Sequence, residues 1–179
     1  MTAPQGPNRY SSLSILLHWL TLALLIGVYV TVELGEGFPR GSERAESLEV
    51  WHFTLGLSVL ALVWLRIVAR LIWPAPAAVE SGWRNALSRL THAGLYTFMI
   101  GMPLAGWLIL SAEGEPVPFF GLQLPALIGP DHQLAEAVEE IHEAGGIMGY
   151  WLIGLHAAAA LFHHFVLRDR LIARMLPGA

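Results

Sequence analysis

The sequence predicts an all-α integral membrane protein, a four-helix bundle, and three observations support this fold class. Of its 179 residues, 55% are hydrophobic and only 13% are charged, well below the charged share of about 25% in ordinary soluble domains. Four apolar runs are each long enough to cross a hydrocarbon core of roughly 30 Å. Cysteine is absent, which excludes disulfides, iron–sulfur clusters and cysteine-held metals, so any metal must be held by histidine.

The predicted spans cover residues 11–32, 50–73, 89–111 and 141–167, in a single membrane domain of residues 1–179. The first run is too long for a signal-peptide core, and no small-residue cleavage site follows it, so we expect it to be the first helix. The chain has no internal repeat and no nucleotide-binding glycine motif. We therefore expect neither phosphate chemistry nor nucleic-acid partners.

The distribution of arginine predicts the orientation in the lipid bilayer. The chain has no lysine, and eight of its ten arginines lie near the two termini and the second connection, whereas only Arg40 and Arg44 lie in the first connection. Because cytoplasmic flanks collect positive charge, we expect both termini in the cytoplasm and the connections 35–49 and 112–140 outside. These outer connections are acidic, since twelve of the 14 Asp and Glu residues lie in them or beside them.

Histidines at membrane depth are the candidate functional residues, because an ionisable side chain there costs free energy. With a rise of about 1.5 Å and a turn of about 100° per residue, His142 and His156 lie roughly 21 Å apart on nearly the same helix face. His142 lies near the outer end, as does His52. His156 lies in the inner half, as does His18. The sequence therefore predicts two depth-matched pairs, one toward each side of the membrane.

Two histidines from facing helices, found twice in an apolar bundle, are typical of haem held by two axial imidazoles. Arg66 lies 14 residues after His52, so it reaches the depth of the inner pair, and Arg70 lies one turn nearer the cytoplasm. Both arginines can pair with haem propionates. Four glycines close to the pairs are expected to leave room for a macrocycle: Gly56, Gly145, Gly146 and Gly149.

Simpler interpretations of these residues remain open on the sequence alone. A single membrane histidine often only makes a hydrogen bond between helices, and arginines near helix ends commonly extend to the interface. His132 is expected to be a solvated loop residue, and no role is expected for His164. The acidic run from Glu136 to Glu143 is expected to be the polar lead-in to the fourth helix.

Six motifs follow one another over nearly the whole chain from Arg9 to Leu176: LLHWL around His18, WHFTLG around His52, LTHAGLY around His92, FFGLQLP at 119–125, IHEAGGIMGYWLIGLH at 141–156 and IGLHAAAALFHHF at 153–165. Together these motifs resemble the bacterial cytochrome b561 family. The similarity is strongest to the di-haem members that oxidise superoxide.

The resemblance implies two haem b groups and a direction of electron flow. It implies that His18 and His156 bind the inner haem, and that His52 and His142 bind the outer haem. It also implies that superoxide is oxidised to oxygen at the outer face of the bacterial inner membrane. The electrons would pass through both haems to ubiquinone.

The resemblance further implies that His92 and His163 contact the ubiquinone. His163 lies seven residues after His156, about 10 Å nearer the cytoplasm on nearly the same face. His92 opens the third span on the same side. Two imidazoles can donate to the two carbonyl oxygens of a quinone and help to protonate it, although His92 alone would more often be a helix-cap or interface residue.

The outer electron donor is less clearly indicated. Arg40 and Arg44, in FPRGSER, are the local attractors for an anion such as superoxide, but acidic residues surround them. A different outer reductant, a protein redox partner at the outer face or the reverse direction of flow are alternatives. The chain could also be the haem b subunit of a hydrogenase or dehydrogenase complex. A histidine-lined carrier of non-haem metal would need carboxylates inside the spans, where there are almost none.

Overall fold

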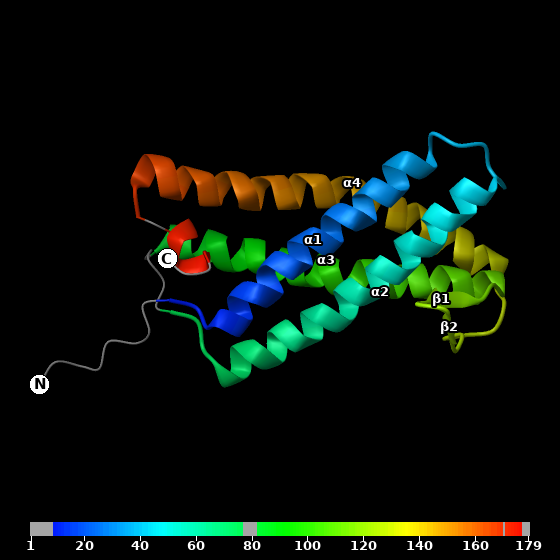
Figure 1. Cartoon of the computed structure of the whole chain (residues 1–179), viewed down its shortest axis with the longest axis horizontal. Coiled ribbons are helices and arrows are strands. Elements are labelled where there is room, and N and C mark those ends of the chain that lie inside the picture. Colours follow the sequence, from blue (N-terminus) through cyan, green and yellow to red (C-terminus); the bar gives the residue numbers. More distant parts are fainter. Residues whose placement is uncertain (1–8, 77–81, 170, 177–179) are drawn as a thin grey trace, which may run out of the picture.

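Four long helices make up most of the chain in the computed structural model, which describes residues 9–76, 82–169 and 171–176. The helices are α1 (Ser12–Gly35), α2 (Glu43–Ile72), α3 (Trp83–Glu113) and α4 (His132–Phe162) (Figure 1). All four are long and apolar enough to cross a membrane. This confirms the predicted all-α membrane four-helix bundle.

Side-chain caps determine where three of the helices begin. Ser11, Ser42 and Asp131 precede α1, α2 and α4, and each accepts a hydrogen bond from a backbone N–H three residues later, at 3.1 to 3.3 Å. Such caps satisfy N–H groups that have no partner within the helix. α3 instead follows Gly82, with φ of 66°, and ends at Gly114, whose left-handed conformation suits a helix C-terminus.

The helices extend beyond the predicted apolar spans. α2 begins at Glu43 rather than 50, α3 at Trp83 rather than 89, and α4 at His132 rather than 141. His132 is thus the first residue of α4 and not a loop residue, although its side chain is exposed as expected. Hydropathy detects only the apolar part of a helix, whereas backbone hydrogen bonds continue into its polar turns.

Neighbouring helices pack in chain order, α1 on α2, α2 on α3 and α3 on α4. In Figure 1, α1 and α2 run diagonally across α3 and α4. Val59 and Val63 of α2 form a buried cluster with Leu95 and Met99 of α3. On α4, by contrast, few side chains are fully buried, so individual side-chain contacts connect it to α1 and α2.

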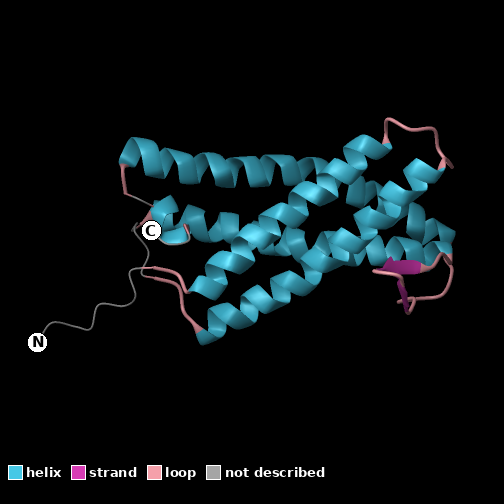
Figure 2. Ribbon diagram, in the orientation of Figure 1, coloured by secondary structure: helices cyan, strands magenta, loops and turns pink. Residues whose placement is uncertain are grey.

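The connection between α3 and α4 contains a small hairpin (Figure 2). Its strands β1 (Val117–Phe119) and β2 (Leu122–Leu124) are antiparallel. Phe120 and Gly121 form the turn with φ of 50° and 79°, the positive values that a two-residue hairpin turn requires. Val117 is buried in a cluster with leucines of α2 and α3, so the hairpin is fixed against the bundle.

Candidate cofactor site

His52 of α2 and His142 of α4 form the first histidine pair, with ring centres 6.2 Å apart and ring planes at 74°. Both side chains are half-buried. Nδ1 of His52 donates to the carbonyl oxygen of Val28 at 3.3 Å, which leaves Nε2 of His52 with a lone pair. Nδ1 of His142 is buried and makes no hydrogen bond of ordinary geometry to the described residues, although the Met102 backbone lies close enough to interact with it.

His18 of α1 and His156 of α4 form the second pair, with ring centres 6.4 Å apart and ring planes at 63°. Both are again half-buried. The Arg66 guanidinium donates to Nδ1 of His18 at 3.4 Å, and the ring centre of His92 lies 5.4 Å from that of His156. Three imidazoles and one guanidinium therefore meet at this level of the bundle.

The two histidines predicted to contact a quinone occupy different surroundings. His92, on α3, uses Nδ1 to donate to the Ser88 carbonyl at 2.6 Å and contacts the second pair. His163 opens η1 (His163–Leu167), a π-helical turn that continues α4. Its Nδ1 donates to the Asp169 carboxylate at 2.5 Å. The structure thus brings His92 to the second pair and His163 to the segment after α4.

The arginines predicted to serve a cofactor differ in their contacts. Arg66 lies over the ring of Tyr96, 5.8 Å from its centre, in addition to its contact with His18. Arg70 lies over the ring of Tyr10, 5.1 Å from its centre. Arg66 is therefore part of the second histidine site, whereas Arg70 lies beside the start of the described chain.

Arg40 and Arg44 lie in and just after the α1–α2 connection, and both side chains are exposed. The Arg44 guanidinium lies over the Phe38 ring, 5.6 Å from its centre. Glu43 and Glu46 share the first turn of α2 with Arg44. The two arginines thus form a small positive surface next to carboxylates.

Open space lies beside two of the four glycines that were expected to make room for a macrocycle. No atom would lie within 4 Å of a Cβ added at Gly56 or Gly146. These residues follow His52 and His142 by four positions, so each shares a helix face with its histidine. The space therefore lies next to the first pair.

The expectation of open space was wrong for the other two glycines, which allow close packing instead. A Cβ at Gly145 would lie 2.6 Å from Sδ of Met102. A Cβ at Gly149 would overlap the side chains of Tyr29 and Phe98. Both positions bring α4 close to its neighbours, and neither leaves space for a ligand.

Tyrosines connect α1 to α4 between the two histidine levels. Tyr29 donates to the Gly146 carbonyl at 2.8 Å, and Tyr150 donates to the Glu33 carboxylate at 2.5 Å. The two tyrosine rings lie 4.2 Å apart. These contacts join two helices that pack little backbone against each other.

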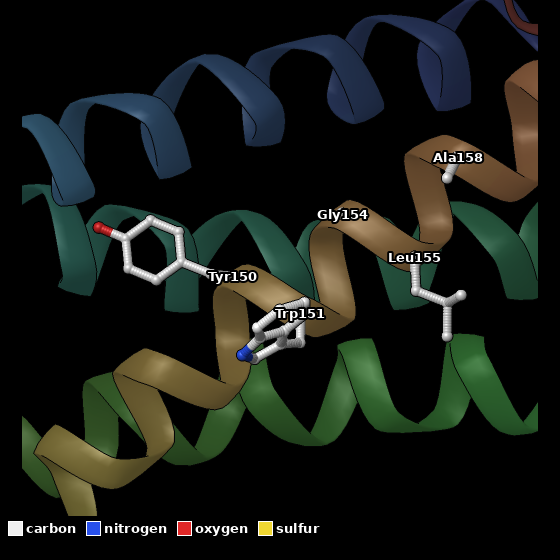
Figure 3. Close-up of a pocket in the computed structure, with 5 residues that line it drawn as sticks. All are labelled: Tyr150, Trp151, Gly154, Leu155 and Ala158. Carbon is white, nitrogen blue, oxygen red and sulfur yellow. The ribbon is translucent and has the colours of Figure 1, made fainter.

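A surface groove of about 440 Å³ follows α4 next to these tyrosines (Figure 3). None of the paired histidines lines it, so it is separate from the histidine sites. The lining residues are Tyr150, Trp151, Gly154, Leu155 and Ala158.

Sequence reasoning did not predict two partners of the site histidines. The partner of His52 is a backbone carbonyl, that of Val28, and a carbonyl carries no sequence signal. Asp169 follows His163 by six residues, a spacing that does not place two side chains on one face of an α-helix. Only the turn after α4 brings them together.

The histidines are grouped in a way that suits two axial ligands. Within the part of the chain that the structure describes, no cluster of three or more His, Cys, Asp or Glu side chains could hold a metal ion. The facing pairs instead supply two imidazoles each, the number that an iron porphyrin takes from the protein in a bis-histidine site.

Comparison with known proteins points to the same chemistry. A family model described as prokaryotic cytochrome b561 matches residues 9–178. Cytochrome b561 homolog 1 of Escherichia coli K12 is 31% identical over 172 residues, which cover 95% of this chain and 98% of that protein. The probable superoxide oxidase CybB of Yersinia pestis is 35% identical over 172 residues, with coverages of 95% and 97%. Cytochrome b562 of Cereibacter sphaeroides is 32% identical over 171 residues, with coverages of 93% and 94%.

The match includes all four helices and both histidine pairs. It extends over nearly the full length of this chain and of its relatives. The chain therefore belongs to the prokaryotic cytochrome b561 family, bacterial multi-pass membrane proteins that transfer electrons with haem b.

Proposed function

We propose that this protein is a di-haem superoxide:ubiquinone oxidoreductase of the bacterial inner membrane. The observation that carries the proposal is the presence of two facing histidine pairs, with ring centres 6.2 and 6.4 Å apart, at two levels of α4. When bound, haem supplies reversible one-electron transfer at its iron. The first pair is the outer site and the second pair is the inner site, on the cytoplasmic side.

The ring separations suit one iron between each pair of imidazoles. An imidazole–metal bond is about 2 Å long, and the bonded nitrogen lies roughly 1 Å from the ring centre, so two rings on one iron have centres about 6 Å apart. We therefore propose His52 and His142 as ligands of the outer haem. His18 and His156 are the proposed ligands of the inner haem.

The surroundings of the outer pair also support a bound haem. A metal-binding histidine usually donates its other ring N–H to a carbonyl or carboxylate, and Nδ1 of His52 donates in this way to Val28. Nε2 of His52 is then the iron-binding nitrogen. The open faces of Gly56 and Gly146 offer space for a flat macrocycle.

At the inner pair, Arg66 is the proposed partner of a haem propionate. Its hydrogen bond makes Nδ1 of His18 an acceptor, whereas iron binding through Nε2 needs a proton on Nδ1. When haem binds, the Arg66 guanidinium must therefore move away from the His18 ring. A haem propionate is a stronger acceptor for the guanidinium than Nδ1 of His18 is. Arg70 is the second candidate for such a pairing.

We propose His92 and His163 as the residues that contact ubiquinone. His92 adjoins the inner pair and has already committed Nδ1 to Ser88, so its Nε2 is the nitrogen available to a ligand. Nδ1 of His163 donates to the Asp169 carboxylate. In the imidazolium form each ring can donate from Nε2 to a quinone carbonyl and supply a proton that quinone takes up on reduction.

Superoxide is the proposed electron donor at the outer face. A relative that is 35% identical is named a probable superoxide oxidase, and the exposed Arg40 and Arg44 offer positive charge to an anion. Two superoxide anions each lose one electron and leave as dioxygen. One ubiquinone gains these two electrons and two protons and becomes ubiquinol.

The proposal is tested by supplying each substrate separately to the purified, haem-replete protein. Haem extraction should give two haem b per chain. In stopped-flow measurements, mixing with superoxide should reduce the haems, and added superoxide dismutase should abolish this reduction. A short-chain ubiquinone should then reoxidise them.

The outcomes separate the parts of the proposal. A colourless protein would contradict the haem assignment, and one haem per chain would contradict the use of both pairs. If superoxide does not reduce the haems while ubiquinol does, superoxide is not the donor. A protein redox partner at the acidic outer connections would then replace it.

A further inference from the structure

The chain reverses at the end of α4 and returns to His163. α4 continues into the π-helical turn η1, and Arg168 then takes a left-handed conformation with φ of 57°. The N–H of Asp169 donates to the His163 carbonyl at 3.3 Å. A straight helix would place Asp169 about 120° around the axis and roughly 9 Å along it from His163. The irregular turn therefore creates a contact that helix geometry forbids.

Both oxygens of the Asp169 carboxylate are held. Oδ2 accepts from Nδ1 of His163 at 2.5 Å, and Oδ1 accepts from the N–H of Leu171 at 3.0 Å. The side chains of His163 and Asp169 are only 17% and 15% exposed. A short hydrogen bond to a carboxylate, largely shielded from water, is stronger than a neutral one. The orientation of the His163 ring is therefore determined by Asp169.

The segment after Asp169 is attached to the start of α1. The indole N–H of Trp19 donates to the Met175 carbonyl at 2.7 Å, and Arg9 donates to the Leu176 carbonyl at 2.6 Å. The short helix η2 (Ile172–Met175) lies between Asp169 and these contacts. The segment thus connects α4 to α1 and keeps Asp169 beside His163.

We propose that Asp169 is a positioning residue for proton transfer to ubiquinone, an inference that rests on the quinone function proposed above. The carboxylate holds a proton on Nδ1 of His163, so that Nε2 faces the substrate. It also stabilises the imidazolium, as the aspartate does in a Ser–His–Asp triad. His163 can then donate from Nε2 to a quinone oxygen.

When the quinone takes up its two electrons, one proton moves from Nε2 of His163 to a quinone oxygen, where an O–H bond forms as the N–H bond breaks. His163, an imidazolium paired with Asp169 before the transfer, becomes neutral with its remaining proton on Nδ1, and a proton from cytoplasmic water then restores the imidazolium. The second proton reaches the other quinone oxygen from the side of His92.

The first test observes His163 directly, without turnover. Side-chain ¹⁵N spectra of histidine-labelled holoprotein are recorded in the dithionite-reduced, diamagnetic state, and the His163 signals are those absent from His163→Gln. The wild type should carry a hydrogen-bonded proton on Nδ1. Asp169→Asn should lose that proton, because an amide N–H favours the opposite tautomer, whereas Asp169→Glu should retain it. Glu33→Gln, which alters a carboxylate bonded to Tyr150, is the matched control and should leave the signals unchanged.

The second test measures haem reoxidation by a short-chain ubiquinone. Asp169→Asn should slow it about tenfold or more, a part of the roughly 10²–10⁴-fold that a well-placed proton donor contributes, because His163 itself remains. Haem content and haem reduction by superoxide should stay as in the wild type. Asp169→Glu should recover most of the rate. Asp169→Asn combined with His163→Gln should be no slower than His163→Gln alone, because the two residues act as a unit.

The outcomes distinguish this inference from the proposed function. If His163→Gln slows reoxidation but Asp169→Asn neither slows it nor changes the His163 tautomer, the role of Asp169 is refuted while the quinone site stands. If His163→Gln reoxidises like the wild type, the quinone assignment itself fails. If Asp169→Asn does not accumulate as holoprotein, Asp169→Glu decides, since loss of the Nδ1 proton in that folded variant also refutes the inference.

Discussion

The His52–His142 pair, the proposed outer site, and the His18–His156 pair, the proposed inner site, have nearly the same ring separation but very different neighbours. Beside the outer pair lie the Phe53 ring, 5.8 Å from the His52 ring, and the backbone of Gly106, next to His142. Beside the inner pair lie the guanidinium of Arg66 and a third imidazole, that of His92. The two pairs therefore have similar geometry, but the outer pair has apolar neighbours and the inner pair has polar ones.

This difference suits the two ends of the proposed reaction. Superoxide gives up an electron without needing a proton, so an apolar site that carries only electrons is sufficient there. Reduction of ubiquinone takes up protons, and Arg66 and His92, which can donate hydrogen bonds, lie beside the proposed inner pair. The different neighbours therefore support the proposed proton chemistry at the inner pair.

The largest expected effect comes from removing one histidine of a pair. His142→Ala and His52→Ala should each lose the outer haem, and His156→Ala and His18→Ala the inner haem, because each iron needs both imidazoles. Haem extraction should give about one haem per chain in every variant. Potentiometric titration should sort the four variants into two classes. Four distinct titration curves would contradict the pairing.

A smaller effect should follow from crowding the outer pair alone. A Cβ at Gly106 would lie 3.5 Å from Cε1 of His142, so alanine fits, whereas leucine must push the imidazole. We expect Gly106→Leu to destabilise the protein by about 1 to 3 kcal/mol, as overpacking does, and to change the outer haem spectrum. Thermal unfolding and low-temperature visible spectra measure both.

Gly101→Leu is the control for this crowding. Gly101 lies on the same helix, is exposed, and has no atom within 4 Å of an added Cβ. Its leucine variant should keep both haem spectra. An inner-haem change in Gly106→Leu that equals the outer one would contradict the assignment of His142 to the outer site.

Charge reversal at the outer surface should affect only electron entry. The double change Arg40→Glu with Arg44→Glu should slow haem reduction by superoxide about tenfold at low ionic strength, because steering of an anion is lost. The difference should shrink at high salt, where screening is stronger. Reoxidation by ubiquinone should not change. Stopped-flow rates at several salt concentrations provide the measurement.

The matched control places the same charge change at the other end of the bundle, as Arg84→Glu with Arg89→Glu. Both of these side chains are exposed on the first turns of α3. If this variant slows haem reduction by superoxide as much as Arg40→Glu with Arg44→Glu does, the net charge of the protein rather than local attraction is responsible. The arginines of the α1–α2 connection would then have no special role.

The smallest expected effect concerns the potential of the inner haem. Arg66→Gln removes a positive charge near the inner pair, and the loss of that charge stabilises the oxidised iron relative to the reduced iron. We expect the midpoint potential of the inner haem to fall by roughly 60 mV, equivalent to about 1.4 kcal/mol for one electron. The outer haem should keep its potential in the same redox titration. Arg70→Gln, whose guanidinium lies over Tyr10, should shift it less, and an equal shift would assign the propionate contact to both arginines.

The fold class and the levels of the histidines follow from local sequence features. Membrane insertion depends on the local density of apolar side chains, so four helices could be predicted from composition and run length. Distances along one helix follow from its regular rise, so His142 and His156 could be assigned to two levels without knowledge of their neighbours. The same arithmetic placed Arg66 at the level of the inner pair, where it contacts His18.

Contacts that no helical repeat describes depend instead on how the helices and turns pack together. Capped polar turns extend α2 and α4 beyond their apolar spans, because hydrogen bonding continues where hydropathy ends. Open space at Gly146 and close packing at Gly145 depend on which side chains of other helices arrive there. Asp169 meets His163 only because the chain leaves helical geometry at Arg168. Such contacts join residues through a turn or between helices, so their geometry depends on how the whole chain packs rather than on local sequence.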